Sequence, residues 1–365
     1  MTDEPVVAFD EAGNTGPDLL HDAQPIFVLA SVHLEHAIAA ELVGRAAMPG
    51  AREVHFKRMR KTTHGRRLLL ELLRAEALTE QAVRAVRYHK RFMITTKVVD
   101  MLVETLLHRQ GVDLYARGAN LGLANMWHHV MPAVCGEDLF DALQQAFVAM
   151  VRWRGPETEA AFYNVVARMR DASTLAEFRR DLTMLLATRA ILDEALGGAL
   201  ASPTLALDPA IPAFFELATY WTGVFPTAFN AVHDPSSPIR TQRELLERLM
   251  STSDPTQVIG TDRRTGAFPI RAAGVQLETQ SHASPQLQVA DATAGAMAYV
   301  LTTRARGTPD SFADELLDTR LAEVYIGGIW PSTAVTPQEL GTESTDGVNA
   351  VDAIAAHLAR RRRAE

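Results

Sequence analysis

Val6-Val-Ala-Phe-Asp10-Glu-Ala-Gly13-Asn-Thr-Gly16-Pro17 is the stretch of sequence from which the fold can be argued. Its apolar beginning is typical of a short strand, and the Gly, Asn and Pro residues that follow are typical of a turn. A second run, Ile26-Phe-Val-Leu-Ala-Ser-Val32, is rich in β-branched and aromatic residues. Two such runs joined by a turn-rich loop predict an antiparallel pair of strands, with Asp10 at the end of the first one.

Periodicity divides the chain into four parts. Residues 1–93 and 226–305 mix period-two patterns with helical ones, whereas residues 94–225 are rich in Ala, Leu and Met at helical spacing. Residues 306–365 are looser and are interpreted as a C-terminal extension. Strands on both sides of a helical middle predict an α/β fold. We therefore expect a mixed sheet flanked by helices, with residues 94–225 as a large helical insertion or cap.

The same patterns predict individual elements within these parts. Further strands are expected at residues 53–56, 82–88, 228–234 and 272–280, and helices at residues 35–47, 65–78, 241–250, 286–303 and 351–363. No internal repeat or low-complexity segment interrupts this order.

The charge of the chain bears on its partners. A net charge of −8 argues against a protein that coats nucleic acid by bulk electrostatics. Locally, residues 52–67 hold seven basic side chains and a single acid, Glu53, and the run from Arg84 to Lys97 holds no acid. Each run is either a solvated face or a surface that contacts phosphates. The second interpretation gains weight only if the runs lie beside catalytic acids.

The sequence also bears on where the protein is located and on which types of site it can form. No run approaches the roughly 18 apolar residues of a membrane span, so no membrane contact is expected. The acidic N-terminus lacks the features of a signal peptide, which predicts a cytoplasmic protein. Cys135 is the single cysteine, so a disulfide within the chain is impossible and a thiolate zinc site is not expected.

Four acidic residues occupy positions where an apolar, basic or turn residue is the usual choice: Asp10, Glu53, Asp234 and Asp291. Asp10 and Asp234 end apolar runs, and Glu53 is the lone acid of its basic stretch. Asp291 lies in a predicted helix among small residues, where a charge is costly unless something positive pairs with it. Each acid alone has an ordinary explanation: a turn cap for Asp10 and Asp234, and an ion pair for Glu53 and Asp291.

Taken together, carboxylates from distant segments are the ligands that Mg²⁺ and Mn²⁺ prefer. Nucleic-acid hydrolases often hold two such ions about 3.5–4 Å apart, where strands end and a helix passes. The metals then activate a water molecule and stabilise the leaving oxygen. This chemistry needs no cysteine and no serine triad.

The motifs resemble those of a bacterial and phage family known as domain of unknown function 3800. Phe9-Asp10-Glu11-Ala12-Gly13-Asn14-Thr15-Gly16 is similar to the Asp-Glu-Ser-Gly opening of that family, with Ala12 in place of serine. Gln286-Leu-Gln-Val-Ala-Asp291 resembles its closing Gln-x-Ala-Asp helix. Weaker similarity is found at Phe27–Ala30, at Glu53-x-x-Phe-Lys57 and at Val232–Asp234.

This resemblance, which spans residues 5 to about 305, implies a ribonuclease-H-like fold with a metal-dependent nuclease site. It points first to Asp10, Glu11 and Asp291, and then to Glu53 and Asp234. Loss of the motif serine leaves a metal site intact. Members of the family often occur in mobile-element and phage-defence settings, which suggests a defence role by association alone.

One feature does not match the usual ribonuclease-H order, in which the strand beside the first one carries a ligand at its end. If residues 82–88 are that strand, it ends in Tyr88-His89-Lys90 without a carboxylate. Either Asp234 serves from the next strand, or the insertion falls between the strands that carry ligands. Both possibilities stay open.

Other side chains have weaker claims. Lys57 is expected to neutralise developing phosphate charge, and His55 to contact water or phosphate, because both share a face with Glu53 if that segment is extended. His128 and His129 are adjacent on a predicted helix and therefore suit packing better than one shared metal. His233 should point to the sheet face opposite Asp234.

These observations predict a Mg²⁺- or Mn²⁺-dependent nuclease that hydrolyses phosphodiester bonds of DNA or RNA by a two-metal mechanism. Asp10, Asp291 and one or both of Glu53 and Asp234 would bind metal, with Glu11 in support and Lys57 as an electrostatic helper. The alternative is a non-catalytic adaptor on the same fold that binds nucleic acid, a protein partner or another copy of itself. A third hypothesis, a phosphoesterase acting on a nucleotide, predicts a closed pocket beneath the helical insertion.

Overall fold

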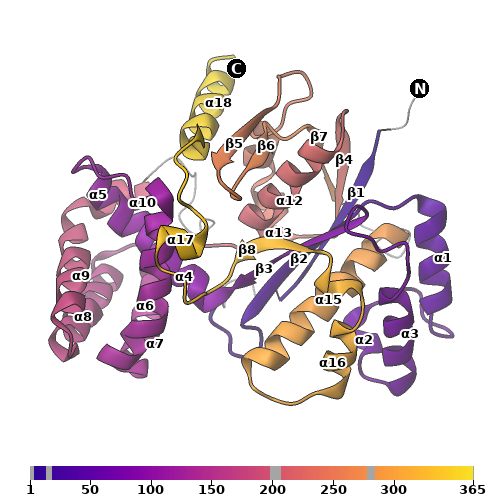
Figure 1. Cartoon of the computed structure of the whole chain (residues 1–365), viewed down its shortest axis with the longest axis horizontal. Coiled ribbons are helices and arrows are strands. Elements are labelled where there is room, and N and C mark those ends of the chain that lie inside the picture. Colours follow the sequence, from indigo (N-terminus) through magenta and orange to yellow (C-terminus); the bar gives the residue numbers. More distant parts are fainter. Residues whose placement is uncertain (1–3, 14–18, 198–206, 278–283, 365) are drawn as a thin grey trace.

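The computed structural model describes residues 4–13, 19–197, 207–277 and 284–364 (Figure 1). Its main feature is a six-stranded mixed sheet in the order β7-β4-β1-β2-β3-β8. The strands are β1 (Val6–Ala12), β2 (Ile26–Val32), β3 (Val83–His89), β4 (Phe229–His233), β7 (Ala272–Leu277) and β8 (Tyr325–Ile329). The expected α/β class with a mixed sheet flanked by helices is therefore confirmed.

Strand β1 lies in the middle of the sheet. It pairs antiparallel with β2 and parallel with β4, and β2 continues the antiparallel arrangement to β3. The pairing with β2 extends to Ala12, which lies opposite Val28. Asp10 therefore lies within the strand, two residues before its end, and not at the end as expected. The strand does not end at Asp10, because the backbone pairing with β2 continues through two more residues, Glu11 and Ala12.

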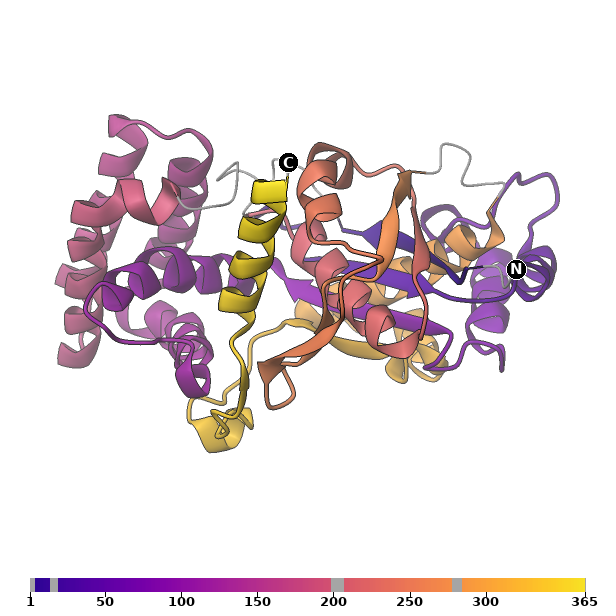
Figure 2. The ribbon, with the colours of Figure 1, turned by 90° about the horizontal axis from the view of Figure 1, so that it is seen from above.

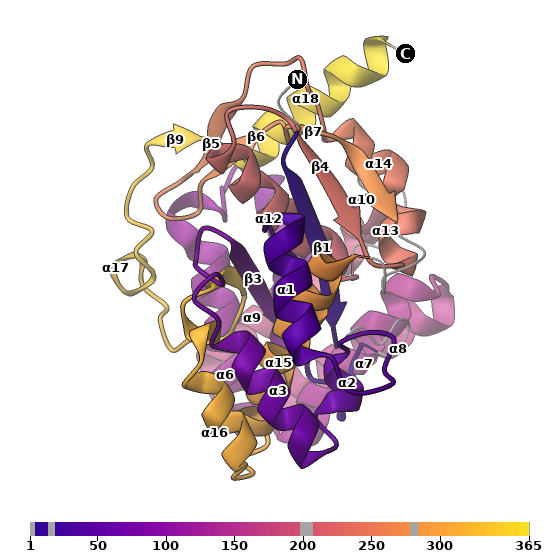
Figure 3. The same ribbon diagram turned by 90° about the vertical axis from the view of Figure 1, so that its right-hand side faces the viewer.

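The two faces of the sheet are covered by different segments. Helix α15 (Pro285–Ala305) packs on β1 and β2, with α1 (His36–Ala46) and α3 (Thr63–Leu73) beside it. Figure 3 shows these helices in front of the sheet. Helix α12 (Ala210–Val224) covers the other face and contacts β2 and β3. Alternation along β1 places Phe9 in the core on the α12 side, whereas Asp10 faces α15.

A helical region follows β3 and ends with α12, just before β4 (Figure 2). Most of its helices lie beside the sheet rather than over it. They are α4 (Lys90–Val98), α5 (Glu104–His108), α6 (Ala119–Cys135), α7 (Glu137–Arg152), α8 (Pro156–Ala172), α9 (Ala176–Ala187) and α10 (Leu192–Gly197). A π-helical turn, Val99–Val103, joins α4 to α5. The last helix, α12, belongs to the layer that covers the sheet.

Several local expectations differ from the structure. Residues 53–56 are not a strand: a bend at Glu53 leads into helix α2 (Phe56–Met59). The helix expected at 241–250 is divided into α13 (Ser237–Thr241) and α14 (Arg243–Arg248). The strand expected at 272–280 is β7, and residues 278–280 lie outside the described residues.

The C-terminal part adds structure that the sequence did not predict. Strand β8 pairs parallel with β3, so residues of the expected extension complete the main sheet. A second, three-stranded sheet has the order β6-β5-β9, formed by β5 (Gln257–Thr261), β6 (Gly266–Phe268) and β9 (Gly347–Val348). Helices α16 (Ser311–Leu317) and α17 (Pro337–Leu340) lie in this region as well, and α18 (Ala350–Ala364) confirms the helix expected at residues 351–363. Within the described residues, no helix is long and apolar enough to cross a membrane.

Candidate functional site

Asp10 is the most buried of the candidate carboxylates, with 8% of the residue exposed. Its Oδ1 accepts a hydrogen bond from the backbone N–H of Glu11 at 2.7 Å. Burial raises the pKa of Asp10 well above its ordinary value, and the negative charges of Asp291 and Asp234 raise it further. The three carboxylates therefore lie close enough to repel one another, which is what a cation would relieve.

Asp234 follows β4 directly, and its position is fixed by the central strand. Its backbone N–H donates to the carbonyl oxygen of Phe9 at 3.0 Å, so the chain stays beside β1 after β4 ends. Because β4 pairs with β1 and β3 does not, the strand beside the first one is followed by a carboxylate. The helical region falls between β3 and β4 in the chain.

Asp291 reaches the same place from α15. Its Oδ1 lies 3.0 Å from Nδ1 of His55, and its Oδ2 accepts a hydrogen bond from the backbone N–H of Phe56 at 2.7 Å. Phe56 begins helix α2, so Asp291 satisfies one of the N–H groups that a helix start leaves without a partner. The bond to Asp291 is the main reason that the pKa of His55 is raised. The positive partner expected for Asp291 is thus His55, together with the N–H group at the start of α2.

A cleft of about 510 Å³ joins these groups. Asp10, Asp234 and Asp291 line it, and so do three cationic side chains, Lys57, Arg60 and Arg306. The other lining residues include Glu11, Gly13, Gln24, His55, Phe56, Gly295, Tyr299, Thr302 and Thr303. The cleft therefore places a carboxylate cluster and a set of cations around one space, and no described residue of the helical insertion lines it.

The close approach of α15 and α2 depends on a small residue. A Cβ added to Gly295 would lie 2.7 Å from the Cβ, Cγ and Cδ1 atoms of Phe56. Real side chains essentially never approach so closely, so glycine at this position lets α2 lie against α15. That contact holds His55 and Lys57, on and beside α2, next to the carboxylates.

Two predicted site residues lie apart from this cluster. Glu53 is absent from the lining of the cleft, and its Oε1 accepts a hydrogen bond from Arg58 at 2.7 Å. Glu11 lines the cleft, but its side chain also faces the α12 side of the sheet, where its Oε2 lies 3.6 Å from Nε2 of the buried His233. Its negative charge also contributes to the raised pKa of Asp208, after burial. Glu11 is therefore shared between two environments.

The two basic runs have different surroundings. Lys57 and Arg60 of the first run line the cleft, and the guanidinium of Arg60 lies 5.1 Å from the ring centre of Tyr299. The second run is dispersed: Arg84 bonds the hydroxyl of Tyr220, and Lys90 is buried. Only the first run lies beside the candidate acids, which strengthens its interpretation as a surface for phosphates.

The weaker candidates are mostly involved in packing. His128 lies edge-on against Phe92, Phe140 and His89, and burial lowers its pKa to about 3. His233 is fully buried on the α12 side and lies parallel to Phe9, as expected. Sequence reasoning did not single out Arg306 or Tyr299. Tyr299 lies in the second half of α15 and Arg306 directly follows the helix, so only their spacing from Asp291 could have drawn attention to them.

The carboxylates that line this cleft offer oxygen atoms and negative charge, which are what Mg²⁺ and Mn²⁺ prefer in a binding site. Asp10, Asp234 and Asp291 are the residues that would hold such an ion. In the described part of the chain, no group of three or more His, Cys, Asp or Glu side chains is already arranged to hold a metal ion.

Comparisons with known proteins give no further information. No protein-family model matches the chain, and no curated protein or solved structure matches it significantly.

Proposed function

We propose that this protein is a divalent-metal-dependent nuclease with a ribonuclease-H-like core, which hydrolyses phosphodiester bonds of DNA or RNA. The observation that carries the proposal is the cleft in which Asp10 lies beside Asp234 and Asp291, with Lys57, Arg60 and Arg306 around the same space. The phage-defence setting suggested by the family resemblance remains part of the proposal.

The strand arrangement supports the ribonuclease-H-like part of this proposal. Three antiparallel strands in the order β3-β2-β1, followed by β4 and β7 parallel to β1, are the arrangement expected of such a core. The candidate acids come from β1, from the residue after β4 and from the helix that crosses them, α15. Strand β8 and the helical region would then be additions to this core.

The charge distribution supports phosphodiester chemistry. A polynucleotide backbone would meet Lys57, Arg60 and Arg306, whose positive charges hold its phosphates and neutralise charge that develops during cleavage. A bound Mg²⁺ or Mn²⁺ supplies an activated water and stabilises the leaving oxygen. Within the protein, Asp291 holds the Nδ1 side of His55, which leaves Nε2 as the nitrogen available for a phosphate or water contact.

Cleavage assays with plasmid, single-stranded DNA and RNA, each with and without Mn²⁺, test this function. Asp10→Asn and Asp291→Asn should each reduce metal-dependent cleavage by at least a hundredfold. Asp314→Asn, which removes an exposed carboxylate from α16, is the matched control and should leave cleavage unchanged. Full activity in both Asp10→Asn and Asp291→Asn would exclude the proposed metal site.

Glu53 and Asp234 can be separated in the same assay. Asp234→Asn should abolish cleavage because Asp234 lines the cleft, whereas Glu53→Gln should retain most of it because Glu53 pairs with Arg58 outside the lining. Titration of the apo protein with Mn²⁺, followed by electron paramagnetic resonance, gives a second readout that does not depend on turnover. The reverse pattern would assign the third carboxylate to Glu53.

A non-catalytic adaptor remains the second candidate, and one observation favours it. Both oxygens of Asp291 already accept hydrogen bonds, from His55 and from the start of α2, so this acid has a structural role without a metal. An adaptor would bind nucleic acid through Lys57, Arg60 and Arg306 but show no Mn²⁺-dependent cleavage and no Mn²⁺ binding. The two proposals therefore differ in both assays above.

A further inference from the structure

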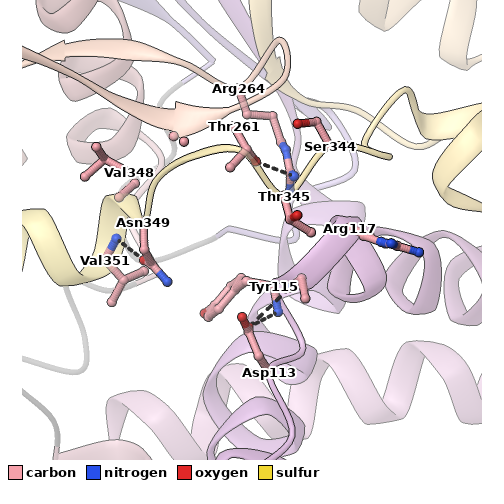
Figure 4. Close-up of a pocket in the computed structure, with 14 residues that line it drawn as sticks. Asp113, Tyr115, Arg117, Thr261, Arg264, Ser344, Thr345, Val348, Asn349 and Val351 are labelled. Carbon is pink, nitrogen blue, oxygen red and sulfur yellow. Dashed lines mark hydrogen bonds between the residues drawn. The ribbon is translucent and has the colours of Figure 1, made fainter.

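A second cleft, of about 330 Å³, lies where three segments distant in sequence meet (Figure 4). Residues 113–117 of the helical region form one wall, residues 260–264 at the end of β5 form another, and residues 344–351 around β9 form the third. None of these residues lines the carboxylate cleft, so the inference that follows does not depend on the proposed function.

One end of this cleft is rich in hydrogen-bond donors. The guanidinium of Arg264 reaches from the β5–β6 turn toward Thr345 and Tyr115 (Figure 4), and it donates to the Thr261 hydroxyl at 3.0 Å. Asp262 lies 3.6 Å from the same guanidinium and compensates part of its charge. Arg264 has five N–H donors in all, so several remain for a ligand. The hydroxyls of Ser344 and Thr345 lie along the same wall.

Asn349 adds a donor on the Tyr115 side of the cleft. Its Oδ1 accepts hydrogen bonds from the backbone N–H groups of Val351 at 2.9 Å and Asp352 at 3.2 Å, as a helix cap does. Because the oxygen is used by the helix, the Nδ2 group is the part of the amide left for the cleft. In Figure 4 the nitrogen of Asn349 points toward Tyr115, into the space between the three segments.

The other side of the cleft is apolar and aromatic. Val348 and Val351 are among the exposed large hydrophobic residues of the described chain, at 41% and 56% exposure, and both line this cleft. The half-buried ring of Tyr115 faces them across the space. Exposed apolar side chains gathered around a concave site with converging polar groups are typical of small-molecule binding.

An acid at the edge of the cleft adds a different kind of contact. The Oδ1 of Asp113 accepts hydrogen bonds from the backbone N–H groups of Tyr115 at 2.8 Å and Ala116 at 3.2 Å, which fixes the carboxylate beside the ring. Such a carboxylate can accept hydrogen bonds from sugar hydroxyls or from an exocyclic amino group. The cleft therefore combines a phosphate-type end, an apolar wall and an acceptor.

The backbone around the cleft is unusual as well. Among the described residues, Arg117 and Asp262 are the two non-glycine residues with positive φ, each at 53°. Arg117 lines the cleft, and Asp262 holds the segment opposite by accepting a hydrogen bond from the backbone N–H of Ser344 at 3.1 Å. Residues held in this conformation cost free energy and cluster at binding sites.

We infer that this cleft binds a nucleoside monophosphate, either free or as the end of a nucleic-acid strand. The phosphate lies at Arg264 and the hydroxyls of Ser344 and Thr345. The base lies against Tyr115 and the two valines, within reach of the Asn349 amide, and Asp113 accepts from the sugar. The volume is at the lower end of the range for small-molecule sites, so it suits one nucleotide and not two.

Isothermal titration of the full chain with AMP, GMP, CMP and UMP, in the presence of EDTA, tests the inference. At least one nucleotide should bind with a Kd in the micromolar range, and inorganic phosphate or the matching nucleoside should bind at least tenfold more weakly. A short oligonucleotide with a terminal phosphate distinguishes a strand end from the free nucleotide. Absence of binding at millimolar nucleotide, or equal binding of phosphate alone, would overturn the inference.

Variants locate the binding to this cleft. Arg264→Gln should weaken binding at least tenfold, whereas Arg263→Gln, the same change at the neighbouring exposed arginine outside the lining, should not. Tyr115→Leu should weaken binding and Tyr115→Phe should retain it, since only the first removes the ring. Loss of binding in Lys57→Gln but not in Arg264→Gln would move the nucleotide to the carboxylate cleft and refute the assignment.

Discussion

The imidazole of His55 and the carboxylate of Asp291 lie 3.0 Å apart, although 236 positions separate them in the chain. This contact joins the start of α2 to α15 and places both side chains at the edge of the same cleft. Because a carboxylate only accepts, Nδ1 of His55 must carry the proton in this pair. Asp291 thus has a structural partner in addition to its proposed role as a metal ligand.

Asp291→Asn should lower the free energy of unfolding of the metal-free protein by about 1–3 kcal/mol. The change replaces one accepting oxygen with an NH₂ group that only donates, so either His55 or the Phe56 N–H loses its acceptor. Chemical denaturation in EDTA measures this change, with Asp314→Asn as the control. An unaltered free energy of unfolding would show that the pairing contributes little to stability.

Asp10→Asn should have the opposite effect. The pKa of Asp10 is raised by burial and by Asp291 and Asp234, so its charged form is disfavoured in the folded state, and stability falls as pH rises through that pKa. Removing the charge should therefore stabilise the metal-free protein at neutral pH. Thermal unfolding in EDTA measures this stabilisation of the metal-free variant. Thermal unfolding in Mn²⁺ tests the metal site, because Mn²⁺ should stabilise the wild type more than the variant.

Gly295→Ala should destabilise the protein although alanine is the better helix former. The added Cβ would lie 2.7 Å from Phe56, and overpacking of this kind costs about 1–3 kcal/mol. Gly44→Ala in α1 is the matched control, because nothing lies within 4 Å of the added Cβ there. The control should gain up to about 1 kcal/mol. Equal effects at both positions would show that α2 shifts readily away from α15.

Glu216, which lies outside the candidate site, should make the stability of the protein depend on pH. Its carboxylate accepts from the Tyr88 hydroxyl at 3.2 Å and from the backbone N–H of Gly328, which ties α12 to β3 and β8, and burial raises its pKa to about 7. Because the folded state holds this proton more tightly than the unfolded chain, the stabilisation is complete below about pH 4.5. It is lost progressively as pH rises toward 7.

Glu216→Gln should remove this dependence, since the amide stays neutral at every pH in this range and its oxygen can still accept from the Tyr88 hydroxyl. The wild type should lose on the order of 3 kcal/mol between pH 4.5 and 7.5 that the variant keeps. Urea denaturation at several pH values gives the comparison. Parallel stability curves for the two proteins would show that Glu216 does not titrate in this range.

The sequence predicted the convergence of Asp10, Asp234 and Asp291 on one space for a physical reason. Each is a charge in an apolar context, and such charges stay only where the fold gives them partners. It could not place Glu53, because Arg58 lies five positions further along the chain and pairs with that acid locally. An acid that forms an ion pair with a nearby residue is not available to a site built from distant segments, and residue type alone does not show which of the two occurs.

The sheet edge was predicted less well than its centre. The apolar runs of β1 and β2 carry a strong strand pattern, whereas β8 contains Gly327 and Gly328, which weaken that pattern. A Cβ at Gly327 would lie 2.0 Å from the Glu216 carboxylate, so the glycine is needed for a contact with α12 that no local pattern reveals. The sheet formed by β5, β6 and β9 depends likewise on pairing between distant segments.

Asp10 and Glu11 are neighbours in the chain, yet one faces α15 and the other reaches His233 beneath α12. Successive side chains of β1 therefore point to opposite faces of the sheet. One residue inserted or deleted between Val6 and Asp10 would exchange Asp10 and Glu11 between these faces, and it would disturb the packing of Phe9 on the α12 side. A change of a single residue in the length of this strand should thus be far more damaging than most substitutions within it.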